Sequence, residues 1–294
     1  MSIRKIADIL KEREQTLSFE FFPPKTQKGR LRLYEAAHLL KDLQPDYISV
    51  TYGAGGSTRE LTMDIVDQLQ KKFGISTMHH LTCIAHSRQE LIDLIDRMKE
   101  KNIKNVLALY GDIPETEGEY ERTESELQYC YELCHLLREH GDYFSIGVAG
   151  FPEGHIDSPD RKTDIRYLKM KLEAGADFVI TQLFFENRDY FDYVRMARAA
   201  GIKAKIIPGI ITISNYNNLV KFCRKCGAKI PERVHKIFKP IAADADETYK
   251  RGLEFSIKQC QQLLDRGAPG LHFFTLNKAD PAREIVKNIK FSKR

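Results

Sequence analysis

Residues 17–26, LSFEFFPPKT, predict a buried β-strand that ends abruptly. Apolar and aromatic residues favour a strand, and Pro23 and Pro24 cannot donate hydrogen bonds to a sheet. Side chains alternate between the faces of a strand, so Glu20 points away from the face of Phe19 and Phe21. We expect burial among these rings to raise the pKa of Glu20, which suits a general acid. The alternative is a structural glutamate paired with a buried cation.

The unit that begins with this strand recurs along the chain at intervals of about 25 to 35 residues, as apolar run, polar loop and amphipathic helix. The runs are 17–22, 47–51, 78–83, 105–109, 145–150, 178–182, 205–211 and 271–276. Most are apolar on both faces, which is typical of parallel strands covered by helices. Eight such units predict an α/β (β/α)₈ TIM barrel rather than a doubly wound sheet.

Three further segments complete the predicted organisation. Residues 1–15 predict a short amphipathic helix, and 248–265 predict an extra helix before the last strand. Residues 287–294 form a basic tail. No linker interrupts the chain, so we expect residues 1–294 to form a single domain. Residues 57–60 predict a capping box, and Ser158-Pro159 predict the start of a helix. Six glycines follow helical segments, where a left-handed residue commonly ends a helix: 74, 141, 175, 201, 227 and 267.

Composition and charge exclude several classes of protein. The apolar fraction of 42% and the charged fraction of 30% are ordinary for a globular protein. No apolar run is long enough for a membrane span, and the first residues do not resemble a signal peptide, so we expect a cytoplasmic protein. Four of the five net positive charges lie in the basic tail, which argues against nucleic-acid binding. The six cysteines predict free thiols, and Cys223 and Cys226 lack the second pair of a zinc site.

In a TIM barrel, the groups that carry chemistry follow the carboxyl ends of the strands. The residues at these positions, many of them polar or aromatic, are Glu20, Thr51, Tyr52, residues 53–56, His79, His80, Thr82, Tyr110, Gly111, Asp112, Phe151, His155, Gln182, Gly209, Asn277 and Lys278. A mouth of this kind suits a flat, partly apolar ligand held by a few polar groups. A heterocycle with both a donor and an acceptor would satisfy the Gln182 amide.

Other patterns are less specific. Residues 53–58, GAGGST, lack the third glycine of a dinucleotide motif and the lysine of a P-loop, so a phosphate site and a plain turn both stay open. His79, His80, Asp112 and His155 lack the spacing of metal ligands, so no metal is predicted. Asp164 and Lys171 share one helix face, which the residues alone favour as a solvated face.

Several motifs together resemble one known family. They are 18–26, 49–54, 80–83, 151–155, 180–182, 207–210 and 274–277, in the order that methylenetetrahydrofolate reductases have them. The resemblance covers about residues 17–280 and implies the bacterial type, the catalytic barrel without the regulatory domain of the eukaryotic enzymes. It implies a flavoprotein, usually with FAD, that reduces 5,10-methylenetetrahydrofolate to 5-methyltetrahydrofolate by hydride transfer through the flavin in one-carbon metabolism.

The resemblance also implies residue roles. Glu20 is the acid that opens the methylene bridge, and Asp112 contacts the pterin and tunes the flavin. Gln182, Phe222 and Lys278 are expected to contact the folate, Phe222 by stacking on the substrate or on nicotinamide. The expected flavin contacts are Thr51, Tyr52, Ala54, His80, Gly111, Tyr129, Phe151, His155, Asp164 and Lys171.

The chain departs from the family pattern at three of these sites. Tyr110 replaces an arginine and Tyr167 an asparagine in the flavin site, and Asn218 replaces a glutamine that helps to hold folate. FMN is therefore an alternative to FAD, and NADH, NADPH or a partner protein could be the electron donor. We expect a homo-oligomer, with a second subunit as a further option. Two other functions stay open: a flavin-free pterin-binding barrel such as a methyltransferase module, and a folate-binding subunit of a larger complex.

Overall fold

The strands close into the barrel that the repeats predict. The computed structural model describes residues 3–52, 59–112 and 123–292, which excludes the whole 53–58 loop with Ala54, the first two residues of its capping box, and the last two residues of the basic tail. The strands are β1 (Thr16–Phe21), β2 (Tyr47–Val50), β3 (Thr77–Thr82), β4 (Asn105–Leu109), β5 (Ser145–Gly150), β6 (Phe178–Leu183), β7 (Lys205–Ile211) and β8 (Gly270–Phe274). They pair in parallel in chain order, and β8 pairs with β1 to close the barrel.

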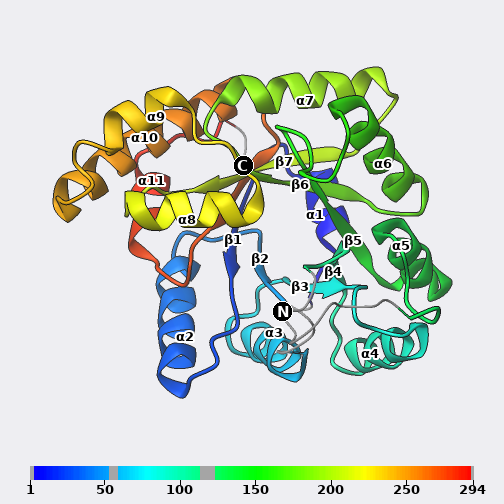
Figure 1. The fold of residues 1–294 in the computed structure, drawn as a ribbon. Coiled ribbons are helices and arrows are strands. Elements are labelled where there is room, and N and C mark those ends of the chain that lie inside the picture. The colour runs from blue at the N-terminus through cyan, green and yellow to red at the C-terminus, as the bar shows by residue number, and fades with distance from the viewer. Residues whose placement is uncertain (1–2, 53–58, 113–122, 293–294) are drawn as a thin grey trace.

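Helices surround the strands (Figure 1). They are α1 (Ile6–Glu12), α2 (Gln27–Lys41), α3 (Arg59–Phe73), α4 (Arg88–Glu100), α5 (Cys130–Glu139), α6 (Arg161–Glu173), α7 (Asn187–Ala199), α8 (Tyr216–Cys226), α9 (Glu232–Phe238), α10 (Ala245–Asp265) and α11 (Asp280–Lys287), with a 3₁₀ turn at Gly141–Tyr143. The TIM barrel and the helix near 248–265 are therefore confirmed. The sequence did not predict α9, a seven-residue helix that begins after Pro231.

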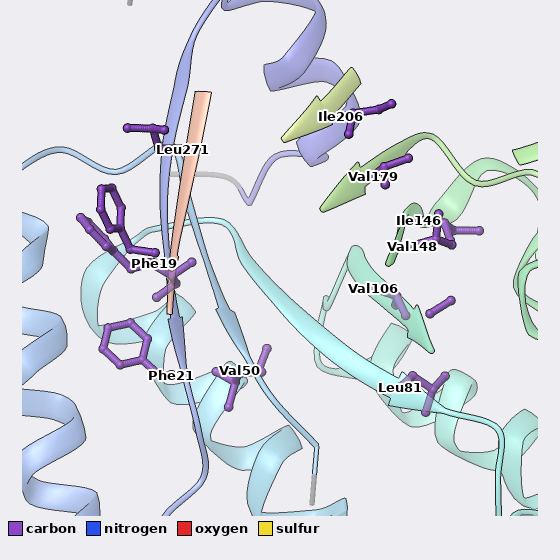
Figure 2. Packing of buried hydrophobic residues seen from close by; sticks show 14 of the residues in the cluster. Phe19, Phe21, Val50, Leu81, Val106, Ile146, Val148, Val179, Ile206 and Leu271 are labelled. Carbon is purple, nitrogen blue, oxygen red and sulfur yellow. The ribbon is translucent and has the colours of Figure 1, made fainter. Parts of the chain in front are cut away.

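Side chains alternate between two apolar layers. The labelled residues in Figure 2, among them Phe19, Phe21 and Leu271, point outward to the helices. A second cluster fills the barrel interior near the amino ends of the strands, where Ile6 and Leu10 of α1 contact strand residues such as Tyr47 and Phe178. Because α1 covers this end, a ligand would reach the interior from the carboxyl ends of the strands.

Hydrogen bonds fix α1 at that end of the barrel. The backbone N–H of Ile6 donates to Asn105 Oδ1 at 2.7 Å, and that of Ala7 donates to Ser145 Oγ at 2.9 Å. Asn105 and Ser145 are the first residues of β4 and β5. The predicted N-terminal helix is thus a plug at the amino ends of the strands.

The observed helix ends can be compared with the predicted caps and terminating glycines. All six glycines predicted to follow helices have a positive φ, as at Gly227 (72°). The predicted start of α6 at Ser158-Pro159 is wrong by two residues, because Asp160 is the N-cap and accepts from the Thr163 N–H at 2.8 Å. In the described residues, no helix is long and apolar enough to cross a membrane.

Candidate active site

Glu20 lies inside the barrel, near the carboxyl end of β1. Its side chain is 15% exposed, and its Oε2 lies 3.3 Å from the Nε2 atoms of both His80 and His272. The Ser49 hydroxyl donates to the same oxygen at 3.5 Å. One carboxylate oxygen therefore faces two imidazoles and a hydroxyl at the floor of the mouth.

These neighbours correct the expected ionisation of Glu20. Burial acts to raise the pKa of Glu20, but His80, His272 and Ser49 together outweigh burial and hold that pKa below its ordinary value. Burial lowers the pKa of His80 to about 4, although Glu20 acts in the opposite direction. The prediction that Glu20 keeps its proton near neutral pH is therefore wrong, because Phe19 and Phe21 face the helices while histidines face the carboxylate.

The sequence interpretation missed His272, Ser18 and Ser49. Ser18 Oγ lies 2.8 Å from His272 Nδ1, and the Tyr47 ring stacks on the His272 ring with centroids 6.2 Å apart. Ser18 shares a strand face with Glu20, which the two-residue period could have indicated. Nothing local in the sequence indicates His272, which is 252 residues from Glu20 and becomes its neighbour when β8 pairs with β1.

Consecutive histidines in β3 face opposite ways. His80 faces Glu20, whereas His79 points outward, with its ring 5.8 Å from that of Tyr52. Both nitrogens of His79, and also Thr82 Oγ1, are buried without a hydrogen-bond partner among the described residues. His80 and Thr82 share the interior face of β3, where His80 faces Glu20 and Thr82 presents an unsatisfied hydroxyl. Tyr52 Oη lies 3.1 Å from His86 Nε2.

The segment after β4 packs tightly on the end of β3. Gly111 has a φ of 101°, and a β-carbon there would lie 2.8 Å from Thr82 Cβ, so only glycine fits. The Tyr110 carbonyl accepts from the Ile84 N–H at 3.0 Å, and the Tyr110 ring packs partly against the outer core. Asp112 follows at the surface of the mouth.

Several expected binding residues gather around α6. The rings of Phe151 and His155 meet edge to face, with centroids 4.5 Å apart. Lys171 donates to the Ala149 carbonyl at 2.6 Å and lies 5.9 Å from the centre of the Phe151 ring. Asp164 is buried, and burial raises the pKa of its carboxyl group against the opposing effect of Lys171. The prediction of a solvated face for Asp164 and Lys171 is therefore wrong for Asp164.

Exposed tyrosines flank that group. Tyr167 of α6 is exposed, and so is Tyr129, whose ring stacks on that of Tyr131 with centroids 5.6 Å apart. Thr51, which directly follows β2, is half-buried, and its N–H donates to the Phe21 carbonyl at 2.8 Å.

The expected substrate residues lie on β6, α8 and the segment after β8. Gln182 sits where the register between β6 and β7 shifts, and its Oε1 accepts from the Leu183 N–H at 2.9 Å. Asn218 and Phe222 are four residues apart on α8, hence on one helix face; Asn218 is exposed and Phe222 half-buried. Lys278 is exposed after β8.

In the described residues, no group of three or more His, Cys, Asp or Glu side chains is arranged to hold a metal ion. Cys226 Sγ donates to the Cys223 carbonyl, 3.8 Å away, within α8. Burial raises the pKa of Cys223 to about 12, so this thiol is a weak nucleophile and a weak metal ligand at neutral pH.

Comparison with known proteins agrees with this geometry. A family model described as methylenetetrahydrofolate reductase matches residues 5–290. Two proteins named 5,10-methylenetetrahydrofolate reductase, from Pectobacterium carotovorum and Salmonella typhimurium, are each 34% identical over 93% of this chain and over 89% and 90% of their own lengths. This chain belongs to the methylenetetrahydrofolate reductase family.

Other members of the reductase family are longer. A methylenetetrahydrofolate reductase (NADH) from Arabidopsis thaliana is 36% identical over 98% of this chain, which spans 50% of that protein. A Clostridium thermocellum protein described as binding two copies of 5-methyl-5,6,7,8-tetrahydrofolic acid has a TM-score of 0.65 and 11% identity, with 96% of each chain covered. The latter similarity concerns the fold alone.

Proposed function

We propose that this chain reduces 5,10-methylenetetrahydrofolate to 5-methyltetrahydrofolate with a bound flavin and a reduced electron donor. The observation that carries the proposal is the buried Glu20 carboxylate, 3.3 Å from two imidazoles at the floor of the mouth. The activity named for the bacterial relatives, which this chain matches over most of their length, supports the same conclusion.

The residues present fit a flavin. Thr82 Oγ1 is a buried polar atom without a hydrogen-bond partner in the described structure, and a heterocycle edge above β3 would supply one. Lys171 and His155 would hold phosphate, and the exposed rings of Tyr129 and Tyr167 offer surfaces for stacking. When bound, a flavin supplies hydride transfer from the donor to the folate.

The chain's own residues would bind the folate and move a proton. Glu20 is ionised in the free protein at neutral pH because its pKa is lowered. A flat ligand that covers Glu20 excludes water, and exclusion of water raises the pKa of a carboxylate. Glu20 would then take up a proton and give it to a bridge nitrogen of the folate as the bond between that nitrogen and the methylene carbon opens.

Other side chains would orient the pterin and the rest of the folate. Gln182 keeps its Nε2 as a donor, because its Oε1 is already bonded to the Leu183 N–H. Phe222 would stack on an aromatic ring of the substrate, and Asn218 on the same helix face and Lys278 would contact its more polar end. Asp112, exposed at the mouth, would contact the pterin and place a negative charge beside the flavin.

The test is a product assay on the purified protein. We expect 5-methyltetrahydrofolate, identified by chromatography, when methylenetetrahydrofolate is supplied with FAD or FMN and with NADH, NADPH or a reduced ferredoxin. The visible spectrum and the flavin released by acid identify the cofactor. A protein that binds neither flavin and forms no product with any donor would contradict the proposal and favour a flavin-free pterin-binding barrel or a folate-binding subunit.

A further inference from the structure

Where β1 and β8 end, three side-chain hydrogen bonds and one backbone hydrogen bond join the two chain segments. Thr275 Oγ1 donates to the Glu20 carbonyl at 2.6 Å, and the Thr275 N–H donates to the same oxygen at 3.3 Å. Asn277 Nδ2 donates to the Phe22 carbonyl at 2.9 Å, while Asn277 Oδ1 accepts from the Phe22 N–H at 3.0 Å. We call Thr275 and Asn277, with these four bonds, the clasp.

The sequence explains why β1 needs the clasp. Pro23 and Pro24 follow Phe22 and have no N–H groups, so Phe22 is the last residue of this segment that a neighbouring strand could hold through a donor. The regular register between β1 and β8 ends at Glu20 and Phe274, so the two clasp bonds to Phe22 lie beyond it. The Asn277 amide donates one hydrogen bond to Phe22 and accepts one from it, and so imitates a strand backbone opposite Phe22.

The backbone adopts an unfavourable conformation to make these bonds. Leu276 and Asn277 have φ values of 50° and 57°, in the left-handed region. Asparagine tolerates this region but leucine does so at a cost, and such residues persist where surrounding interactions hold them. The Asn277 N–H donates to Thr275 Oγ1 at 3.1 Å, and the Lys278 N–H donates to the Thr275 carbonyl at 3.0 Å.

The clasp acts on the residue that carries the proposed chemistry. Two of the four clasp bonds are accepted by the Glu20 carbonyl. The other two hold the N–H and the carbonyl of Phe22. Glu20 Oε2 must stay near His80 Nε2 and His272 Nε2, which lie on two other strands. A shift of the β1 end along the barrel axis would change both distances.

We propose that Asn277 is a positioning residue that, together with Thr275, fixes the end of β1 and so holds the Glu20 carboxylate between His80 and His272 for proton delivery. This inference rests on the proposed function for the catalytic role of Glu20. The geometric part concerns the chain alone and can be tested without substrate.

Asn277→Gly is the main variant, because glycine accepts the left-handed backbone and removes both side-chain bonds. Asn277→Asp keeps the size and the acceptor but loses the donor to the Phe22 carbonyl. Asn102→Gly is the matched control: Asn102 is an exposed asparagine at φ 54°, before β4 and therefore at the amino ends of the strands. Thr275→Val removes the hydroxyl donor and is a second variant should Asn277→Gly fail to fold.

The first measurement is the pKa of the Glu20 carboxyl group, by NMR of labelled protein without ligand. The groups that face this carboxylate are His80, His272 and Ser49. These three groups lower the Glu20 pKa, whereas burial raises it. A looser β1 end should weaken the effect of the three groups and leave that of burial, so the Glu20 pKa should rise in Asn277→Gly and rise less in Asn277→Asp. Asn102→Gly should leave it unchanged.

The second measurement is the pH profile of folate reduction. We expect kcat to fall by about 10- to 100-fold in Asn277→Gly, the range that a misplacement of about 1 Å can cause, with the pKa in the profile shifted upward. Reduction of the flavin by the donor should be unchanged. An unchanged Glu20 pKa in folded Asn277→Gly or Thr275→Val would overturn the positioning role, even if wild-type protein proved inactive on folate. A raised Glu20 pKa in the variants, together with a wild-type protein that is inactive on folate, would instead contradict only the proposed function.

Discussion

The two sides of the barrel mouth differ in how their side chains are held: on one side by hydrogen bonds within the protein, whereas on the other they are exposed. On the β1/β8 side, Glu20 is held through its carbonyl and its carboxylate by Thr275, Ser49 and His272. On the β4/β5 side, Asp112, Tyr129 and Tyr167 are exposed. Under the proposed function, the contrast corresponds to a division of labour: the first side would carry out proton transfer, and the second would offer its exposed surface to a ligand.

The largest expected effect comes from Glu20→Gln, on the β1/β8 side. Glutamine keeps the shape but cannot donate the proton, and general acid catalysis is worth about 10² to 10⁴ in rate. Formation of 5-methyltetrahydrofolate should fall by that factor, while flavin content and flavin reduction by the donor are retained. A melting curve is the control, because replacing a purely structural glutamate would lower the melting temperature. Wild-type turnover in a stable, flavin-bearing variant would remove Glu20 from the mechanism.

His79→Leu separates burial from function within β3. Burial, and to a lesser extent His80, lowers the pKa of His79 to about 3, so the folded state resists a proton that the unfolded state binds below about pH 6.5. The stability of the wild type should therefore fall as pH falls, and replacing the histidine with leucine, which does not titrate, removes this loss.

The free energy of unfolding of His79→Leu, relative to wild type, should rise by about 2 kcal/mol between pH 7 and pH 5. Urea unfolding at the two pH values measures it, with His38→Gln as a surface histidine control. Folate turnover at neutral pH should be unchanged, since His79 faces away from Glu20. A difference independent of pH would show that His79 takes up a proton as readily in the folded protein as in the unfolded one.

Asp112→Asn tests the β4/β5 side. It removes a negative charge beside the proposed flavin, and two charges about 4 Å apart in water interact by about 1 kcal/mol. The reduction potential should rise, and folate reduction should slow by about tenfold, which corresponds to about 1.4 kcal/mol of barrier. An equilibrium titration with a reference dye measures the potential. The same potential in both proteins would place Asp112 away from the flavin ring.

The smallest effect is expected from Tyr110→Arg. A guanidinium forms charge-assisted bonds to phosphate that a phenol cannot match, so FAD should bind more tightly by about 1 kcal/mol and FMN by less. The Tyr110 ring packs partly against the outer core, which limits the gain. Titration of the apoprotein with each flavin measures the difference. Identical curves for variant and wild type would show that position 110 does not reach the cofactor.

The sequence predicted those features that depend on local pattern. Apolar runs separated by helical periods predicted eight strands, and the glycines after helices marked positive φ values correctly. The charge state of Glu20 was not predictable, because it depends on His272, which reaches Glu20 only through barrel closure. The start of α6 was wrong because Ser158 and Asp160 are both capable caps two residues apart, and the geometry of the preceding loop selects Asp160.

The division of labour can be tested in one paired experiment. The flavin dissociation constant and the folate turnover at saturating flavin are measured for Glu20→Gln and for Tyr129→Ala, an exposed position whose ring contacts that of Tyr131. The account predicts that Glu20→Gln loses turnover and keeps flavin affinity, whereas Tyr129→Ala loses flavin affinity and keeps turnover. Loss of both properties in both variants, or the reverse assignment, would contradict it.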